Sequence, residues 1–268
     1  MTPLQLRTTA LALALIAGGA AGAGRLSAQS LDRRVLAGDG AVQFVFAARE
    51  GVCGDGARFI EDGFGGEGRI YENGSTFNRG RDELWPSCFP GPVRVVASVT
   101  SGEIVRLRTY AGPVRSTTTS VRDLGVVPVA DAVAFLTRLI EGDKGRVGEQ
   151  AVLPFVLADS TSPWPTLLRV ARDDKLSRGR RSNVSFWLSR GAAFKLGLTD
   201  QADEPDDDVR SSAVFALSQQ HNSEAIPQLL ELARHSKHPA VRAQALFWLG
   251  QSHDRRAIDY FGEVLGGR

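Results

Sequence analysis

Four histidines are the residues best suited to proton transfer or metal binding: His221, His235, His238 and His253. His221 and His253 lie 32 residues apart, which is also the period of a repeat described below. Neighbouring repeats pack on the order of 10 Å apart, whereas imidazole ligands of one Zn²⁺ each lie about 2 Å from the metal. The spacing therefore favours polar residues in two equivalent turns, and we expect neither a metal ion nor a cofactor.

Two charged stretches offer other chemistry. Residues 200–208 carry six carboxylates, which could bind a divalent cation or form a solvated loop that caps the following helix. A basic cluster precedes them and is either a solvated face or a surface for an anionic partner: Arg169, Arg172, Lys175, Arg178, Arg180 and Arg181. The sequence leaves both pairs of alternatives open.

Catalytic motifs are absent from the sequence. It contains neither a Gly-x-Ser-x-Gly elbow nor a His-Glu-x-x-His motif. The glycine-rich stretches 51–56 and 63–68 lack the Gly-Lys-Ser/Thr ending of a phosphate loop. Trp187 and Trp248 occupy equivalent repeat positions, which is typical of core between units. We therefore expect no catalytic residues and a protein that is not an enzyme.

The first residues predict export. Arg7 provides a positive charge, and the run from Ala10 to Ala23 is almost entirely Ala, Leu, Ile and Gly. This pattern is typical of a secretory signal peptide, here residues 1–28, with an uncleaved anchor as the alternative. We expect the mature protein in a periplasm or outside the cell, without a membrane span.

An oxidising compartment makes the two cysteines informative. Cys53 and Cys88 are the only pair, so export predicts a disulfide between them. Such a bond would stabilise the fold by roughly 4 kcal/mol in the chain-entropy model. The net charge of +2 for 268 residues gives no field that selects a nucleic acid.

The elements that must position these residues differ between the two halves of the chain. Alternating apolar residues predict strands over 41–49, 93–100 and 103–110, with a hairpin turn at Ser101-Gly102. The sequence thus predicts a small β domain over 31–112, whose long loop the disulfide staples. The polar residues 113–127 read as a linker.

Residues 128–268 carry a helical repeat. Val209-Arg210 recurs as Val241-Arg242, and seven further positions recur at the same offset, from Ala213 and Ala245 to Ala225-Ile226 and Ala257-Ile258. Weaker matches at offsets of 62 and 61 extend the repeat backwards. They predict four successive units at 147–174, 178–200, 207–235 and 239–265, with a helix at 131–141 covering the start of the stack.

The repeat motif resembles the HEAT-like repeat family, which includes the short repeats of phycobilisome lyases. The motif is Val-Arg opening a helix, a following Ala, a Leu-Gly/Ser-Gln segment, a polar turn and Ala-Ile at the next helix. The resemblance covers about residues 147–265. It implies an α-helical solenoid that serves as a binding scaffold.

These observations predict an α+β protein in two parts, a disulfide-stapled β domain and a short HEAT-like solenoid. We expect an exported, non-enzymatic scaffold that binds an as yet unidentified protein through the exposed side of the second helices: Gln228, Glu231, Arg234, Arg255, Asp259 and Glu263. The alternative is an envelope enzyme or lyase-like protein with a site in the β-domain loop. A third reading is a structural module without a ligand. The sequence fixes neither the partner nor the oligomeric state.

Overall fold

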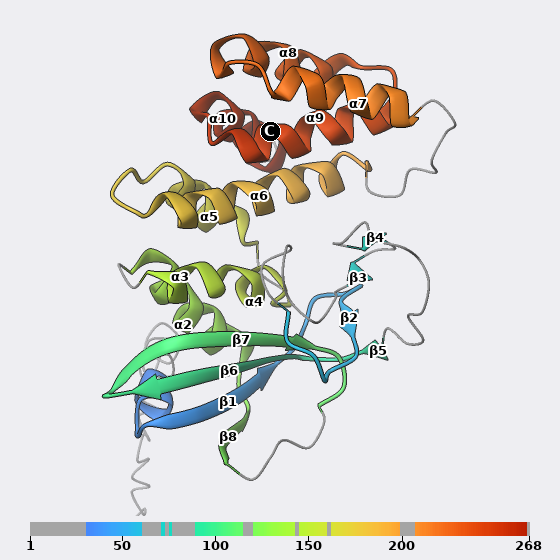
Figure 1. The fold of residues 1–268 in the computed structure, drawn as a ribbon. Helices are drawn as coiled ribbons and strands as arrows, with labels where there is room; N and C mark the ends of the chain where they lie inside the picture. Colours follow the sequence, from blue (N-terminus) through green and yellow to red (C-terminus); the bar gives the residue numbers. More distant parts are fainter. Residues whose placement is uncertain are drawn as a thin grey trace, which may run out of the picture.

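A four-stranded sheet forms the first part of the protein (Figure 1). The computed structural model describes residues 31–60, 71–72, 75–76, 89–114, 120–142, 145–159, 162–198 and 207–266. Strands β1 (Gly40–Phe46), β6 (Val93–Thr100), β7 (Glu103–Ala111) and β8 (Val121–Val126) lie in the order β7-β6-β1-β8. Strand β1 is antiparallel to β6 and parallel to β8. Four two-residue strands form a second, small sheet: β2 (Cys53–Gly54), β3 (Tyr71–Glu72), β4 (Ser75–Thr76) and β5 (Phe89–Pro90).

The β6–β7 hairpin turns at Ser101-Gly102, as the sequence predicts. Both residues have positive φ angles, 53° and 73°, and the Asp39 carboxylate accepts hydrogen bonds from their two amides at 2.9 and 3.1 Å. Those two hydrogen bonds hold the pKa of Asp39 below its usual range. A side chain from before β1 therefore fixes the turn between two later strands.

The linker prediction for 113–127 is wrong for residues 121–126, because these form β8. The polar side chains that suggested a linker are satisfied within the fold. Asp123 accepts a 2.8 Å hydrogen bond from Gln43 of β1, and the Arg122 guanidinium donates to the carbonyl of Val35 at 2.8 Å. Polar composition alone therefore does not distinguish this edge strand from a linker.

Helix α2 (Val129–Glu141) covers the sheet and not the start of a helical stack, which corrects a second prediction. Its Phe135 packs edge-on against Phe44 of β1, with ring centroids 5.6 Å apart. Helices α3 (Arg146–Gln150) and α4 (Val152–Val156) lie beside it, and α3 also contacts β7. The boundary predicted at residue 128 therefore cuts through one packed unit of sheet and helices.

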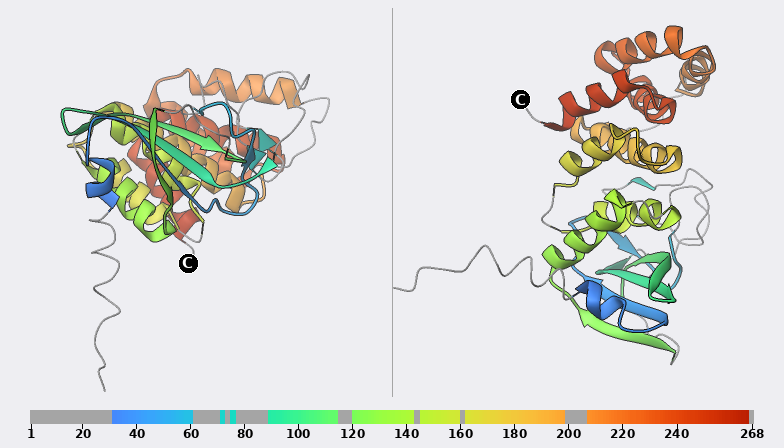
Figure 2. Two further views of the ribbon diagram at one scale, coloured as in Figure 1. Left: turned by 90° about the horizontal axis from the view of Figure 1, so that it is seen from below. Right: turned by 90° about the vertical axis from the view of Figure 1, so that its left-hand side faces the viewer.

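The helices α5 to α10 form three pairs stacked above this unit (Figures 1 and 2). Their bounds are α5 Trp164–Ala171, α6 Arg178–Lys195, α7 Asp207–Ser218, α8 Asn222–His235, α9 Pro239–Ser252 and α10 Arg255–Gly266. The order of the pairs in space is not their order in sequence. The pair α9/α10 lies between α5/α6 and α7/α8, so the prediction of units that follow one another holds only for the last two.

The junction between α7/α8 and α9/α10 is a translation by one repeat. Its contacts join residues that lie about one period apart in the sequence. Arg234 pairs with Glu263 at 3.2 Å, the Asn222 amide donates to the carbonyl of Ser252 at 3.4 Å, and the Phe215 ring lies 5.3 Å from that of Trp248. This is the stacking that the sequence repeat predicts.

At the junction between α5/α6 and α9/α10, the helices of the two pairs run in opposite directions. Arg178 and Arg181, at the start of α6, act electrostatically on His253, which follows the end of α9. Arg172 at the end of α5 pairs with Asp259 near the start of α10 at 2.9 Å. Helices α6 and α9 are therefore antiparallel, and the chain reverses the direction of the stack here.

Glycine makes this reversed junction possible. Gly250 of α9 lies opposite Ser189 of α6, its own repeat equivalent, and a Cβ atom at Gly250 would lie 2.7 Å from the Ser189 Cβ. Gly262 of α10 likewise faces Leu168 of α5, its equivalent in that pair. When two copies of a motif pack head to head, equivalent positions meet near the local axis. A side chain at position 250 would collide with Ser189, whereas a Cβ atom at position 262 would lie 3.7 Å from Leu168, within ordinary contact.

A buried arginine fastens the helix pairs to the sheet unit. Arg180 of α6 is 1% exposed, and its guanidinium donates to the carbonyls of Ile140 and Gly145, both at 3.1 Å, and of Gly142. These carbonyls lie at and just beyond the end of α2, where backbone oxygens lack helical partners. A buried charge is tolerated when it is hydrogen-bonded in this way.

Gly250 gives the first test. Replacing Gly250 with Ala would by helix propensity stabilise α9 by about 0.5–1 kcal/mol, but the clash with Ser189 costs about 1–3 kcal/mol. We expect Gly250→Ala to lower the free energy of unfolding, measured by urea denaturation. Gly266→Ala is the control, because a Cβ at Gly266 meets nothing within 4 Å. A Gly250→Ala protein as stable as wild type would contradict the close approach.

Candidate functional site

The six residues predicted to bind a partner all lie on the surface. Gln228, Glu231 and Arg234 are exposed on α8, and Arg255, Asp259 and Glu263 are exposed on α10. They lie on the outward side of the second helices because apolar residues at i, i+3, i+4 and i+7 face the core: Ile226, Leu229, Leu230 and Ala233. Whether a partner contacts these residues is untested.

Ion pairs extend this surface onto the sheet unit. From the far end of the stack, Arg234 of α8 pairs with Glu263 of α10 at 3.2 Å, and Asp259 of α10 pairs with Arg172 of α5 at 2.9 Å. Arg169 of α5 then pairs with Glu141 at the end of α2. We define the charged face as the predicted six residues together with these three: Glu141, Arg169 and Arg172.

The charged face alternates in sign and stays accessible. The side chains of Arg234 and Glu263 are 40% and 57% exposed, and those of Arg172 and Asp259 are 41% and 53% exposed. Pairs this exposed stabilise a fold by only about 0–1 kcal/mol. Their main contribution is therefore not to folding, and they can exchange partners at low cost.

Tyr260 supports the middle of the charged face. Tyr260 is 6% exposed, and the Arg234 guanidinium lies over its ring, 4.7 Å from the ring centroid. Burial is the main cause that raises the pKa of Tyr260. The aromatic ring fixes the Arg234 head group in place and reduces the entropy that it would lose on binding.

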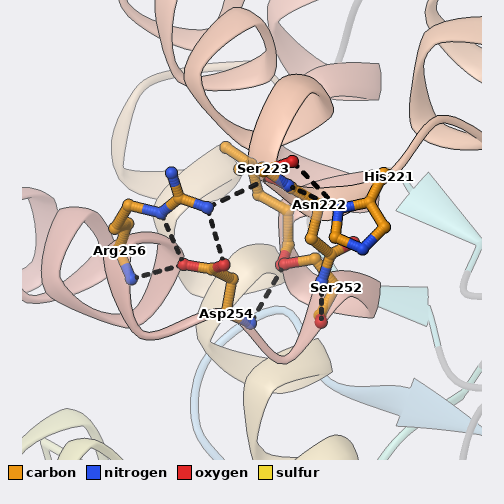
Figure 3. Close-up of polar contacts among 7 residues, drawn as sticks. His221, Asn222, Ser223, Ser252, Asp254 and Arg256 are labelled. Carbon is orange, nitrogen blue, oxygen red and sulfur yellow. Dashed lines mark hydrogen bonds and ion pairs between the residues drawn. The ribbon is translucent and has the colours of Figure 1, made fainter.

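The turns of the repeat form a second polar edge (Figure 3). His221 caps the start of α8, where its Nδ1 accepts from the Ser223 amide at 3.3 Å. Asp254 accepts from the Arg256 guanidinium at 2.9 Å, which is the main cause that lowers the pKa of Asp254. Arg256 also donates to the carbonyl of Asn222 at 3.1 Å. This edge ties α8 to α10 and has a structural role.

His221 and His253 thus lie at equivalent turns. Within the described part of the chain, no group of three or more His, Cys, Asp and Glu residues is arranged to hold a metal ion. The acidic residues 200–206 lie outside the described residues, so a cation site there stays untested. Of the described helices, none is long and apolar enough to cross a membrane.

The basic cluster of the sequence does not form one face. Arg180 is buried against backbone carbonyls, whereas Arg169 and Arg172 belong to the charged face. Arg181 pairs with Asp174 at 2.7 Å on the turn before α6. The two tryptophans also differ, because Trp187 is 2% exposed and Trp248 is only partly buried beside Phe247.

Sequence reasoning missed a buried polar cluster on the sheet. The Arg94 guanidinium donates to the carbonyl of Gly56 at 2.9 Å and to the Gln43 amide oxygen at 3.4 Å. It also lies 3.9 Å from the centre of the Tyr110 ring, and burial lowers its pKa. The signal was the placing of Gln43 and Arg94 in otherwise apolar strands. The cluster holds the loop that contains Cys53 against the sheet.

Cys53 takes part in a disulfide, and the described residues contain no free cysteine. Cys88 lies outside the described residues. The Cys53–Cys88 pairing therefore stays a prediction.

His253 gives a pH-dependent test. Partial burial and the charges of Arg178 and Arg181 lower the pKa of His253 below about 6.5, its value in an unfolded chain. The unfolded state therefore takes up the proton first as the pH falls, and stability decreases below about pH 6.5. We expect the urea midpoint to fall between pH 7.5 and 5.5, and to fall less in His253→Asn. Asn suits the left-handed backbone at this position, where φ is 57°. An equal fall in both proteins would contradict the placement of His253 beside these arginines.

Comparisons with known proteins place part of the chain in a family. The family model of HEAT repeats matches residues 196–267. The comparisons with curated proteins and with solved structures give no match. The family model spans the translational pairs α7/α8 and α9/α10 and does not reach back to residue 147. Residues 196–267 are therefore similar to HEAT repeats.

Proposed function

We propose that the protein is an exported, non-enzymatic scaffold whose HEAT repeats bind another protein through the charged face. The observation that carries the proposal is the continuous, exposed alternation of opposite charges across α8, α10 and α5. Packed helices underneath hold it rigid, so binding would order few side chains beyond those already fixed. HEAT repeats are helical scaffolds for protein interaction, which supports the same conclusion.

The mixed signs favour a protein as partner over a polyanion. A phosphate backbone would meet Glu141, Asp259 and Glu263 among the arginines, and each of these carboxylates would repel it. A folded protein surface or a peptide can present a complementary mosaic of both signs. The net charge of +2 is consistent with this choice.

Export is supported by two features of the sequence. Arg7 and the apolar run that follows it have the form of a signal peptide. A disulfide at Cys53 agrees with an oxidising compartment, where such bonds persist. The alternative function, an enzymatic site in the β-domain loop, concerns residues of which most lie outside the described ones.

A charge swap tests the charged face. Arg234→Glu with Glu263→Arg keeps the internal ion pair and the net charge, so the fold should be retained while the order of charges is reversed. A partner protein should co-purify with the full chain from an envelope extract. We expect the amount of partner recovered with the charge-swap variant to be lower by about tenfold or more, as for loss of a central interface contact.

The control for the swap is Arg33→Glu with Glu50→Arg, which reverses two exposed charges on the sheet unit. The amount of partner recovered with this control variant should equal that recovered with wild type. If quantitative mass spectrometry finds equal recovery with the charge swap and with wild type, the charged face is not the binding surface.

Maturation is tested separately by intact-mass measurement of the protein from the producing cells. We expect a chain that begins near Ser30 or Leu31, because cleavage removes the signal peptide. Iodoacetamide should add nothing before reduction and should label both Cys53 and Cys88 after it. A full-length mass would contradict cleavage, and labelling before reduction would contradict the disulfide.

A further inference from the structure

The helix pair α7/α8 forms the end of the stack that lies farthest from the sheet unit (Figure 1). Its inner side packs on α9/α10, and no helix of the described part of the chain lies on its outer side. A terminal unit of a repeat array that faces water carries a polar outer face, because no neighbouring unit covers it. The residues on the outer side of α7/α8 therefore show whether this end is built to face water.

The sequence repeat identifies these residues on α8. Because α9/α10 repeats α7/α8 at an offset of 32 residues, each residue of α10 that α8 covers has an uncovered equivalent on the outer side of α8. Tyr260 of α10 is 6% exposed, with the Arg234 guanidinium of α8 over its ring. Its equivalent, Gln228, is exposed, and Leu232, one turn further along α8, is partly exposed.

The same comparison identifies the outer residues of α7. Ala245 of α9 is 0% exposed, and Trp248, one turn further along α9, lies 5.3 Å from the Phe215 ring of α7. The equivalents of Ala245 and Trp248 in α7 are Ala213 and Ala216, and both are exposed. Two positions that a neighbouring pair covers in α9 are therefore open to solvent in α7.

We define the end face as Ala213 and Ala216 of α7 with Gln228 and Leu232 of α8. None of these four side chains is charged. Two alanines, a leucine and one amide do not make the polar cap expected of a terminal unit. Small side chains instead allow another helix to approach closely, toward the lower end of the usual 8–10 Å between helix axes.

We propose that the end face binds the end face of a second copy of this chain. Within the chain, the equivalent face of α9/α10 is already covered by a helix pair of the same repeat, so a pair of this kind fits it. In a second copy the inner side of α7/α8 is occupied, which leaves its outer side for the contact. Two identical faces then meet across a two-fold axis and close the assembly as a dimer.

Two observations favour this occupant over a segment of another protein. The chain already docks two of its own helix pairs head to head, where Gly250 meets its repeat equivalent, Ser189. Near a two-fold axis each residue meets its own copy, so a charged residue there would face a like charge. The end face carries no charge, which suits contact with itself and offers nothing to an acidic or basic segment.

Sedimentation equilibrium of the purified protein tests the dimer. We expect the weight-average mass to rise from that of one chain toward that of two between about 1 and 100 μM, as for a contact smaller than a standard interface. A mass of one chain over this whole range would overturn the proposal.

Ala213→Glu is the variant that tests the location of the contact. Glutamate is a good helix former and the position is exposed, so thermal unfolding of the monomer should be unchanged. Two like charges would face each other in the dimer, and we expect its dissociation constant to rise by about tenfold or more. The control is Gln244→Glu, which adds the same charge on α9, outside the contact, and should leave the dissociation constant within about threefold. Wild-type association of Ala213→Glu would overturn the proposal.

Ala213→Lys shows whether the occupant is a second copy. An equimolar mixture of the Ala213→Glu and Ala213→Lys proteins should associate about tenfold more tightly than either protein alone, because opposite charges then face each other. If the mixture associates no more tightly than the separate variants, the two end faces do not meet and the proposal fails.

The inference goes beyond the proposed function and uses other residues, so the two can fail separately. The Arg234–Glu263 charge swap should leave the mass of the protein at each concentration unchanged. If the swap abolishes recovery of the partner and the dimer persists, both conclusions stand. If the swap abolishes the dimer while Ala213→Glu does not, the copies meet through the charged face and the end face is wrong.

Discussion

The close approach of α6 and α9 is the constraint on which the arrangement of the helices depends. It requires a glycine at position 250, where a Cβ would lie 2.7 Å from the Ser189 Cβ, and beside it Gly262 of α10 faces Leu168 of α5. Because these positions are small in α9 and α10, the last pair can dock head to head onto α5/α6. The pair α7/α8 is thereby carried to the far end, and helices α5, α8 and α10 lie on one side of the stack. The charged face exists only in this order, since Arg172 meets Asp259 across the reversed junction.

The sequence predicted the parts of the fold that follow from local patterns. The 32-residue period placed α7 to α10 and the contacts between them, because translation brings equivalent positions together. Alternation placed β1, β6 and β7. The reversal was not predicted, because a repeat period states which residues are equivalent and does not state which pairs are neighbours. At the 32-residue offset, Ser218 and Leu230 of one repeat correspond to Gly250 and Gly262 of the next. This change to glycine was the sequence signal for a junction that is not a translation.

Two errors in the first part of the protein have a common cause. Strand β8 was taken for a linker because Arg122 and Asp123 are polar, and α2 was assigned to the repeats because it is an amphipathic helix. In both segments the deciding contacts are with residues about 80 or more positions earlier, such as Gln43 and Phe44. The exposed positions of the candidate surface were predicted correctly because exposure on a helix follows its own periodicity. The contribution of α5 to this surface was not predicted, because it depends on a contact between Arg172 and Asp259, which are 87 residues apart in the sequence.

The enclosed position of α9/α10 limits how this array can grow. In an ordinary solenoid the last repeat is the free end, and duplication of that repeat lengthens the column. Here α9/α10 has a helix pair on either side, so a further unit could not stack directly on it. Such a unit would have to pack on the outer side of α7/α8, and the segment joining it to α10 would have to pass one helix layer, roughly 10 Å by the usual separation of packed helices.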